Sequence, residues 1–184
     1  MTCVVALRHD GRIYMGADSA GVGGWYSRQN RMDPKIYRVG EMLIGFTTSF
    51  RMGQLLGYSL SVPHHHPDVA IEKYMATTFI NAVRECLKGG GWAEKDKEQE
   101  KGGNFLVAYK GRIFEIQRDY QVAESADAFN AVGCGQDLAL GSLHTSQGWT
   151  LKPRDRVEIA LEAAAAFSAG VHPPFKIEEL AWTS

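Results

Sequence analysis

Short runs of apolar residues, separated by turn signals, open the chain. Residues 3–7 and 13–17 flank Asp10-Gly11, a dipeptide suited to the positive φ angles of a tight hairpin turn. Two more pairs of apolar runs are likewise separated by a short turn: residues 35–39 with 42–46, and residues 105–109 with 112–116. The pattern therefore predicts three β-hairpins. Shorter strands are expected at residues 120–123, 129–132 and 175–180.

Apolar residues spaced three and four apart mark the helices. The expected helices are residues 50–60, 67–88, 137–143 and 157–167. Pro67-Asp68 begins the second of these, and Gly89-Gly90-Gly91 ends it. Gly53 and Gly57 weaken the first, and close approach of a neighbouring element explains them about as well as simple tolerance does.

Two polar stretches show neither periodicity. Residues 21–30 are expected to form an exposed loop, and the charged residues 94–101 a solvated loop or a fraying extension. The element order is then strands, two helices, strands, two helices and a strand. Such an order predicts an α+β fold in which antiparallel sheets pack on each other beneath helix layers, four layers in all.

The composition is that of an ordinary globular protein. With 184 residues, 45% of them apolar, the chain is expected to form one domain over residues 1–184. Its net charge of −1 argues against nucleic acid as a partner. Its apolar runs, of which residues 160–169 come nearest, are too short to span a membrane, and residues 3–7 are too short for a signal peptide. Three cysteines at unrelated spacings form neither a disulfide framework nor a zinc pattern, so we expect a cytoplasmic protein.

Candidate chemistry lies near the amino terminus. If Met1 is removed, Thr2 carries a hydroxyl and a free α-amine on neighbouring atoms, which makes it a nucleophile with its own base. A threonine at position two is common, and only its companions give it weight. Taken singly, Lys35 is most simply a solvated lysine at a strand end, and Asp18 a turn residue. The spacing of all three together favours chemistry.

Several segments together resemble proteasome β-type subunits and the bacterial HslV peptidase. Besides Thr2 and Lys35, they are Gly16-Ala17-Asp18-Ser19, Leu43-Ile44-Gly45-Phe46 and Ala131-Val132-Gly133-Cys134-Gly135. The resemblance implies an N-terminal nucleophile hydrolase with an αββα sandwich, a threonine peptidase that cleaves polypeptides without a cofactor. It also implies a homo-oligomeric ring or helical chamber, and it allows for an ATPase unfoldase as a partner.

The resemblance assigns roles to three residues. Thr2 would attack the substrate carbonyl while its own α-amine, directly or through water, moves the proton. Lys35 would favour the deprotonated hydroxyl and lower the pKa of nearby proton acceptors. Asp18 would hold Lys35 in place by an ion pair.

Three positions depart from the family pattern. Thr48 is the best match to a glycine-containing turn whose backbone N–H binds the oxyanion in the family, and Ser49 is the second choice. Because threonine is excluded from the backbone conformations open to glycine, we expect the geometry of the pocket to be altered. Cys134 replaces a serine bonded to the nucleophile's amine, and a thiol supports proton transfer poorly; a small buried residue at a turn explains it equally well. Ser168 matches a second supporting serine, but Ala165 stands where an acid is expected.

These departures leave two other functions open. One is a catalytically inactive assembly or scaffold subunit, and the other is an amidase for a small non-peptide substrate. Phe46, Phe50 and Met52 lie near positions that shape a substrate pocket, although core packing explains them more simply. His64-His65-His66 places adjacent side chains on opposite faces of an extended chain and has no second ligand group, so no metal site is expected.

Overall fold

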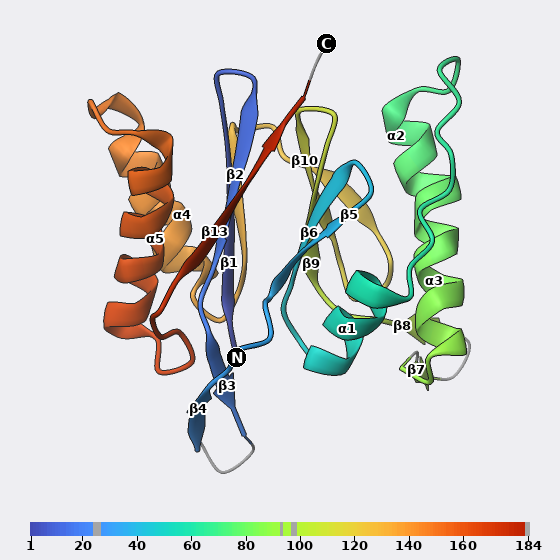
Figure 1. Ribbon diagram of the computed structural model, residues 1–184, viewed down its shortest axis with the longest axis horizontal. Helices are drawn as coiled ribbons and strands as arrows, with labels where there is room; N and C mark the ends of the chain where they lie inside the picture. The colour runs from blue at the N-terminus through green and yellow to red at the C-terminus, as the bar shows by residue number, and fades with distance from the viewer. Residues whose placement is uncertain (24–26, 93, 97–98, 183–184) are drawn as a thin grey trace.

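The computed structural model describes residues 1–23, 27–92, 94–96 and 99–182. Two antiparallel β-sheets lie face to face in the middle of the molecule, and helices lie on the outer side of each sheet (Figure 1). The α+β class expected from the sequence is therefore confirmed. Among the helices in the described ranges, none combines the length and the apolar character needed to cross a bilayer.

The first sheet has the strand order β12-β1-β2-β13. Its strands are β1 (Cys3–His9), β2 (Arg12–Ala17), β12 (Phe129–Gly133) and β13 (Lys176–Ala181). Helix α4 (Gln136–Thr145), the 3-10 turn η2 (Ser146–Gly148) and helix α5 (Pro153–Phe167) follow β12, and both helices cover the outer face (Figure 1). Their apolar side chains form a core with β1, to which Val5, Leu143 and Leu161 belong.

The second sheet has the strand order β11-β10-β9-β6-β5. Its strands are β5 (Ile36–Val39), β6 (Met42–Phe46), β9 (Phe105–Tyr109), β10 (Arg112–Ile116) and β11 (Val122–Glu124). On its outer side lie α1 (Phe50–Tyr58), α2 (Ile71–Tyr74), the π-helical segment η1 (Met75–Phe79) and α3 (Ile80–Gly89). A second core, rich in aromatic residues, fills the space between these helices and the sheet.

The two sheets pack through a third core made of small and branched side chains. Val4 and Ala6 from β1 meet Leu106 and Ala108 from β9. At Gly45 in β6, an added Cβ would lie 2.5 Å from Cγ1 of Val4, so a glycine is required for the sheets to approach this closely. This contact therefore fixes the start of β1, in the first sheet, against the second sheet.

The three predicted hairpins are present, and the other expected strands and helices are found with ends shifted by up to four residues. Asp10 and Gly11 have φ angles of 42° and 72°, as a two-residue hairpin turn requires. The expectation of a loop at residues 21–30 is wrong, because β3 (Ala20–Val22) pairs with β4 (Arg28–Asn30). The loop expected at residues 94–101 is likewise a strand pair, β7 (Glu94–Asp96) with β8 (Gln99–Lys101). Residues 24–26 and 97–98, within these two stretches, lie outside the described residues.

The second helix begins at Ile71 rather than at Pro67, which corrects the prediction. A turn precedes it, in which the Val69 N–H donates to the carbonyl oxygen of His66 at 3.0 Å. The ring of His65 stacks on Tyr74 with centroids 4.3 Å apart, which holds this turn against the helix.

Close approach accounts for the two glycines of α1. A Cβ at Gly53 would lie 2.1 Å from the Phe46 ring, and one at Gly57 would lie 2.4 Å from the Tyr37 ring. Each glycine therefore lets an aromatic ring of the second sheet pack directly on the backbone of α1. Of the two explanations left open by the sequence, packing is the one that the structure supports.

Candidate active site

Thr2, Asp18 and Lys35 meet beside the amino terminus, which lies near the lower ends of the two sheets in Figure 1. The Nζ atom of Lys35 donates to Oγ1 of Thr2 at 2.5 Å. It also lies 2.9 and 3.0 Å from the two carboxylate oxygens of Asp18. Thr2, Asp18 and Lys35 are 5%, 2% and 3% exposed, so these contacts are shielded from water.

The first hairpin positions Asp18. Val4 pairs with Ala17 across β1 and β2, so Asp18 follows at the level of Cys3. One carboxylate oxygen accepts from the Cys3 N–H at 3.0 Å, and the other accepts from the Ala20 N–H at 2.9 Å. A buried carboxylate needs such donors, and here two amides and one ammonium group supply them.

Lys35 lies directly before β5 and has one more partner, the carbonyl oxygen of Ala20 at 2.7 Å. Burial lowers the pKa of Lys35 below the ordinary lysine value, and the attraction of Asp18 acts in the opposite direction. Burial, followed by the nearby charge of Asp18, also raises the pKa of the Cys3 thiol to about 12, which keeps that thiol protonated. The Nζ atom of Lys35 thus lies between the carboxylate of Asp18 and the hydroxyl of Thr2.

Cys134 and Ser168 form a second line of contacts to Thr2. The Thr2 N–H donates to Sγ of Cys134 at 3.3 Å, and the Ser168 hydroxyl donates to the same sulfur at 3.4 Å. The Cys134 thiol is exposed, so the interpretation of this residue as a small buried one is wrong. Gly133 has a φ of 106°, and a Cβ there would lie 2.1 Å from the carbonyl oxygen of Thr2. Ala165 adds no polar side-chain atom to this line.

Thr48 occupies a backbone conformation that is rare for threonine. Its φ is 63°, so the expectation that threonine is excluded from glycine-like conformations at this position is wrong. The Ser49 N–H donates to the carbonyl oxygen of Thr47 at 2.6 Å, which makes Thr48 the centre of a three-residue γ-turn. Thr48 lines a pocket that Thr2 also lines.

That pocket has a volume of about 70 Å³ and lies directly beside Thr2. Its walls are Met1, Thr2, Val22 and residues 46–50. Phe50 is partly exposed, and the guanidinium group of Arg31 lies 3.8 Å from the centroid of its ring. Met52 is fully buried in the second core, as the packing interpretation predicts, whereas Phe46 contributes to both the core and the pocket.

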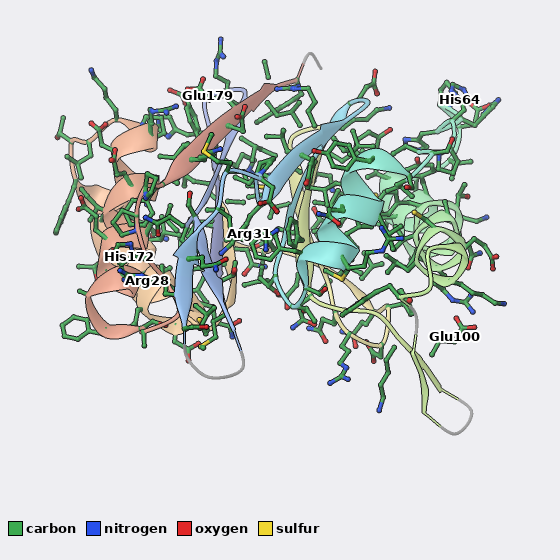
Figure 2. All side chains as sticks on the ribbon, turned by 60° about the horizontal axis from the view of Figure 1, so that its bottom comes forward. Arg28, Arg31, His64, Glu100, His172 and Glu179 are labelled. Carbon is green, nitrogen blue, oxygen red and sulfur yellow. The ribbon has the colours of Figure 1, made fainter. Side chains whose placement is uncertain are left out.

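Two residues next to the site were not singled out from the sequence. Asn104 bonds to Thr47 and Thr48, and Arg31 stacks on Phe50 while forming an ion pair with Asp33 at 2.7 Å. Arg31 directly follows β4 and lies in the middle of the view in Figure 2. The one sequence signal that could have pointed to Asn104 is the pair Gly102-Gly103 directly before it, because consecutive glycines indicate a backbone that approaches another segment closely.

The three consecutive histidines have no part in this site. His65 bonds to the Tyr109 hydroxyl at 3.0 Å and to the carbonyl oxygen of Val69 at 2.7 Å. His64 lies at the far edge of the molecule in Figure 2. Within the described ranges, no group of three or more His, Cys, Asp or Glu side chains is arranged to hold a metal ion.

Comparison with solved structures identifies the fold. BPH from Thiobacillus denitrificans superposes with a TM-score of 0.81 at 22% identity, over 99% of this chain and 100% of that one. This chain has an HslV-like fold, that of proteasome β-type subunits. HslV from Trypanosoma brucei matches with a TM-score of 0.69 at 15% identity, over 97% of this chain and 99% of that one. Anbu, the ancestral β-subunit from Yersinia bercovieri, matches with a TM-score of 0.67 at 16% identity, over 98% of this chain and 82% of that one.

No family model and no curated protein matches the sequence. One of the BPH structures contains epoxomicin. At these identities, the similarity concerns the fold, and the chemistry has to be inferred from the residues of the site itself.

Proposed function

We propose that the chain is a threonine-type amide hydrolase, a peptidase whose nucleophile is Thr2 once Met1 has been removed. Residues 1–184 then form one domain, the four-layer αββα sandwich of N-terminal nucleophile hydrolases. The observation that carries this proposal is the buried contact of 2.5 Å between Nζ of Lys35 and Oγ1 of Thr2. A solvated lysine at a strand end would have no reason to lie there.

The first chemical step is attack by Oγ1 of Thr2 on the substrate carbonyl carbon. The free α-amine of Thr2 accepts the hydroxyl proton, directly or through water, while the new C–O bond forms. The N–H of Thr48 stabilises the oxyanion, helped by the positive end of α1, which begins at Phe50. The tetrahedral intermediate then expels the amine product, which leaves with that proton, and an ester remains on Thr2.

Water completes the cycle. It loses a proton to the same α-amine as it attacks the ester carbon. The C–O bond to Thr2 then breaks to release the acid product, and the α-amine returns the proton to Oγ1 of Thr2, which restores the hydroxyl and the free amine. Lys35 lowers the energy of the alkoxide in both steps, because its ammonium group contacts the same oxygen. Asp18 keeps Lys35 charged and oriented.

Cys134 and Ser168 orient the nitrogen of Thr2 in this scheme. Their contacts of 3.3 and 3.4 Å form a continuous line from the Ser168 hydroxyl through sulfur to that nitrogen. With Met1 attached, the nitrogen belongs to an amide and has no basic lone pair. Removal of Met1 is therefore required for activity.

The HslV-like fold supports polypeptide substrates and a self-compartmentalising homo-oligomer, either a ring or a helical assembly. We place this assembly in the cytoplasm, with an ATPase unfoldase as a possible partner. The intact contacts among Thr2, Asp18 and Lys35 favour an enzyme over an inactive scaffold subunit. The pocket beside Thr2 is open to solvent in the single chain, so enclosure of the substrate would come from assembly.

The mass of the amino-terminal peptide tests the proposal. We expect loss of Met1 and, after treatment with an epoxyketone, an adduct on Thr2, because this reagent requires both the hydroxyl and the free amine. A Thr2→Ala variant is the matched control and should give no adduct. Quantitative retention of Met1 in an active preparation would contradict the proposed nucleophile. A free amino terminus without an adduct would support the scaffold subunit instead.

A further inference from the structure

Thr48 has an unfavourable backbone conformation that its surroundings must maintain. A residue other than glycine in the left-handed region costs about 1–3 kcal/mol, and a β-branched side chain is among the least suited to it. Thr48 nevertheless has a φ of 63° directly beside the proposed nucleophile. Glycine would adopt this conformation freely, so a specific contact of the threonine side chain has to compensate.

Asn104 supplies that contact through its backbone. Its N–H donates to Oγ1 of Thr48 at 3.1 Å. Its carbonyl oxygen accepts from the N–H of Thr47 at 3.0 Å and from the Thr47 hydroxyl at 2.8 Å. Three hydrogen bonds therefore join Asn104 to the first two residues of the γ-turn.

The turn leaves one amide free at the pocket. The N–H of Thr47 is bonded to Asn104, and the N–H of Ser49 is bonded to Thr47. Among the described residues, the N–H of Thr48 has no protein acceptor. Thr48 is therefore a better oxyanion donor than Ser49, and the direction of its N–H depends on the φ angle of the turn.

We propose that the hydroxyl of Thr48, held by the backbone amide of Asn104, is the positioning group that aims the Thr48 N–H at the oxyanion. This inference rests on the proposed hydrolase function. The hydroxyl does not touch the reacting atoms. It acts by fixing the left-handed turn, as a substitute for the conformational freedom of glycine.

Gly103 leaves the space that this contact needs. A Cβ at Gly103 would lie 2.9 Å from Oγ1 and from Cβ of Thr48, and 2.6 Å from Sδ of Met52. Gly102 is itself fixed, because its N–H donates to the carbonyl oxygen of Arg118 at 2.8 Å. The segment that holds Thr48 is thus anchored on the second sheet's side of the site.

The rate at which a β-lactone acylates Thr2 tests whether the Thr48 N–H points at the oxyanion. Oγ1 of Thr2 forms a bond to the lactone carbonyl carbon, the ring C–O bond breaks, and the hydroxyl proton passes through the α-amine to the released alkoxide. The step proceeds through an oxyanion. Removing an oxyanion donor costs roughly 10²–10³ in rate, so we expect Thr48→Val, which lacks Oγ1, to acylate about 10- to 100-fold more slowly. In peptide hydrolysis, kcat should fall by the same factor while KM changes less than twofold.

Two further variants separate the orientation of the Thr48 N–H from a general effect of the substitution on the stability of the fold. Thr48→Ser retains the hydroxyl and should recover most of the rate that Thr48→Val loses. Thr48→Gly lacks the hydroxyl but adopts a positive φ freely, so it should also exceed Thr48→Val. Thr145→Val, at a helix hydroxyl that bonds to Gly141, is the matched control and should not change the rate. Equal rates for Thr48→Val and wild type would overturn the inference, as would a Thr48→Gly variant as slow as Thr48→Val.

Periodate oxidation distinguishes a failure of the inference about Thr48 from a failure of the proposed hydrolase function. Periodate cleaves an N-terminal threonine between its amine-bearing and hydroxyl-bearing carbons, and this reaction needs no oxyanion donor. We expect all the Thr48 variants to react with periodate as wild type does. A wild-type chain that reacts with periodate but not with the lactone would contradict the hydrolase proposal itself.

Discussion

The carboxylate of Asp18 accepts a hydrogen bond from the backbone N–H of Cys3 at 3.0 Å, so it binds the residue that follows Thr2 as well as Lys35. One side chain therefore fixes the position of the proposed nucleophile and that of its cation. Because the ion pair is almost completely buried, its loss should affect folding and chemistry together.

Asp18→Asn should lower the free energy of unfolding by about 3–5 kcal/mol, because it leaves the buried Lys35 ammonium group without its counter-charge. Urea denaturation at neutral pH measures this loss. The double variant Asp18→Asn/Lys35→Met should lose less than the sum of the two single variants, since each single change leaves one charge unpaired.

Glu179→Gln is the control for that measurement. Glu179 lies 3.5 Å from Arg12 and 3.6 Å from Arg154 on the surface, and exposed pairs of this kind contribute about 0–1 kcal/mol each. An Asp18→Asn variant as stable as Glu179→Gln would mean that the buried pair is not held in its charged form.

The activity should fall at alkaline pH as Lys35 loses its proton. Burial lowers the pKa of this lysine below the ordinary value of 10.5, so the alkaline limb of kcat should lie below that pH. In Lys35→Arg, the guanidinium group stays charged, and any remaining activity should lack this limb. If the alkaline limb of kcat were the same in Lys35→Arg as in wild type, the limb would belong to a titrating group other than Lys35.

The same shift in the pKa of Lys35 makes a prediction for stability. Between the lowered pKa of the folded chain and 10.5, the unfolded chain binds more protons at this lysine than the folded chain does. The contribution of Lys35 to the free energy of unfolding should therefore rise with pH in this window. It should be lost as the pH falls through the folded pKa, and a Lys35→Met variant should show no such slope.

Gly133→Ala should both destabilise the fold and displace the nucleophile. Its φ of 106° disfavours alanine, and the added Cβ would lie 2.1 Å from the carbonyl oxygen of Thr2. We expect a loss of about 1–3 kcal/mol in urea denaturation, together with loss of the epoxyketone adduct. Gly141→Ala, in α4 with no neighbour within 4 Å of its added Cβ, should instead be more stable by about 0.5–1 kcal/mol with full adduct formation.

Cys134→Ala should lower kcat by about tenfold, equivalent to about 1.4 kcal/mol, with little change in KM. The change removes the sulfur that both the Thr2 nitrogen and the Ser168 hydroxyl contact. Cys134→Ser keeps a polar atom there and should retain most of the activity. Cys86→Ala is the control, because this thiol contacts the carbonyl oxygen of Leu55, away from Thr2. Equal kcat values for Cys134→Ala and Cys86→Ala would remove Cys134 from the proposed mechanism.

The sequence is informative where local geometry decides the outcome. A two-residue turn at Asp10-Gly11 fixes the register of the first hairpin, so Ala17 pairs with Val4 and Asp18 must follow beside Cys3. That is why Asp18 lies next to the proposed nucleophile. The hairpins at 105–116 and 36–46 are predictable for the same reason.

Features that depend on distant contacts could not be predicted. The left-handed φ of Thr48 is maintained by Asn104, which is 56 residues away, and nothing in the local sequence indicates that pairing. The strand β4, Arg28-Gln29-Asn30, has three exposed polar side chains and hence no period that marks a strand. The true start of the second helix depends on His65 stacking against Tyr74, which Pro67 alone does not indicate.

The peptide bond between Met1 and Thr2 has a consequence for how the molecule matures. Thr2 directly precedes β1, a strand bonded on both sides, and its hydroxyl already contacts Lys35 while Met1 is still attached. Cleavage of one covalent bond would convert a buried amide into the missing base and remove a side chain from the wall of the pocket. Maturation would then require no refolding, and its timing would be set by access of an aminopeptidase to a residue that is 47% exposed in the single chain.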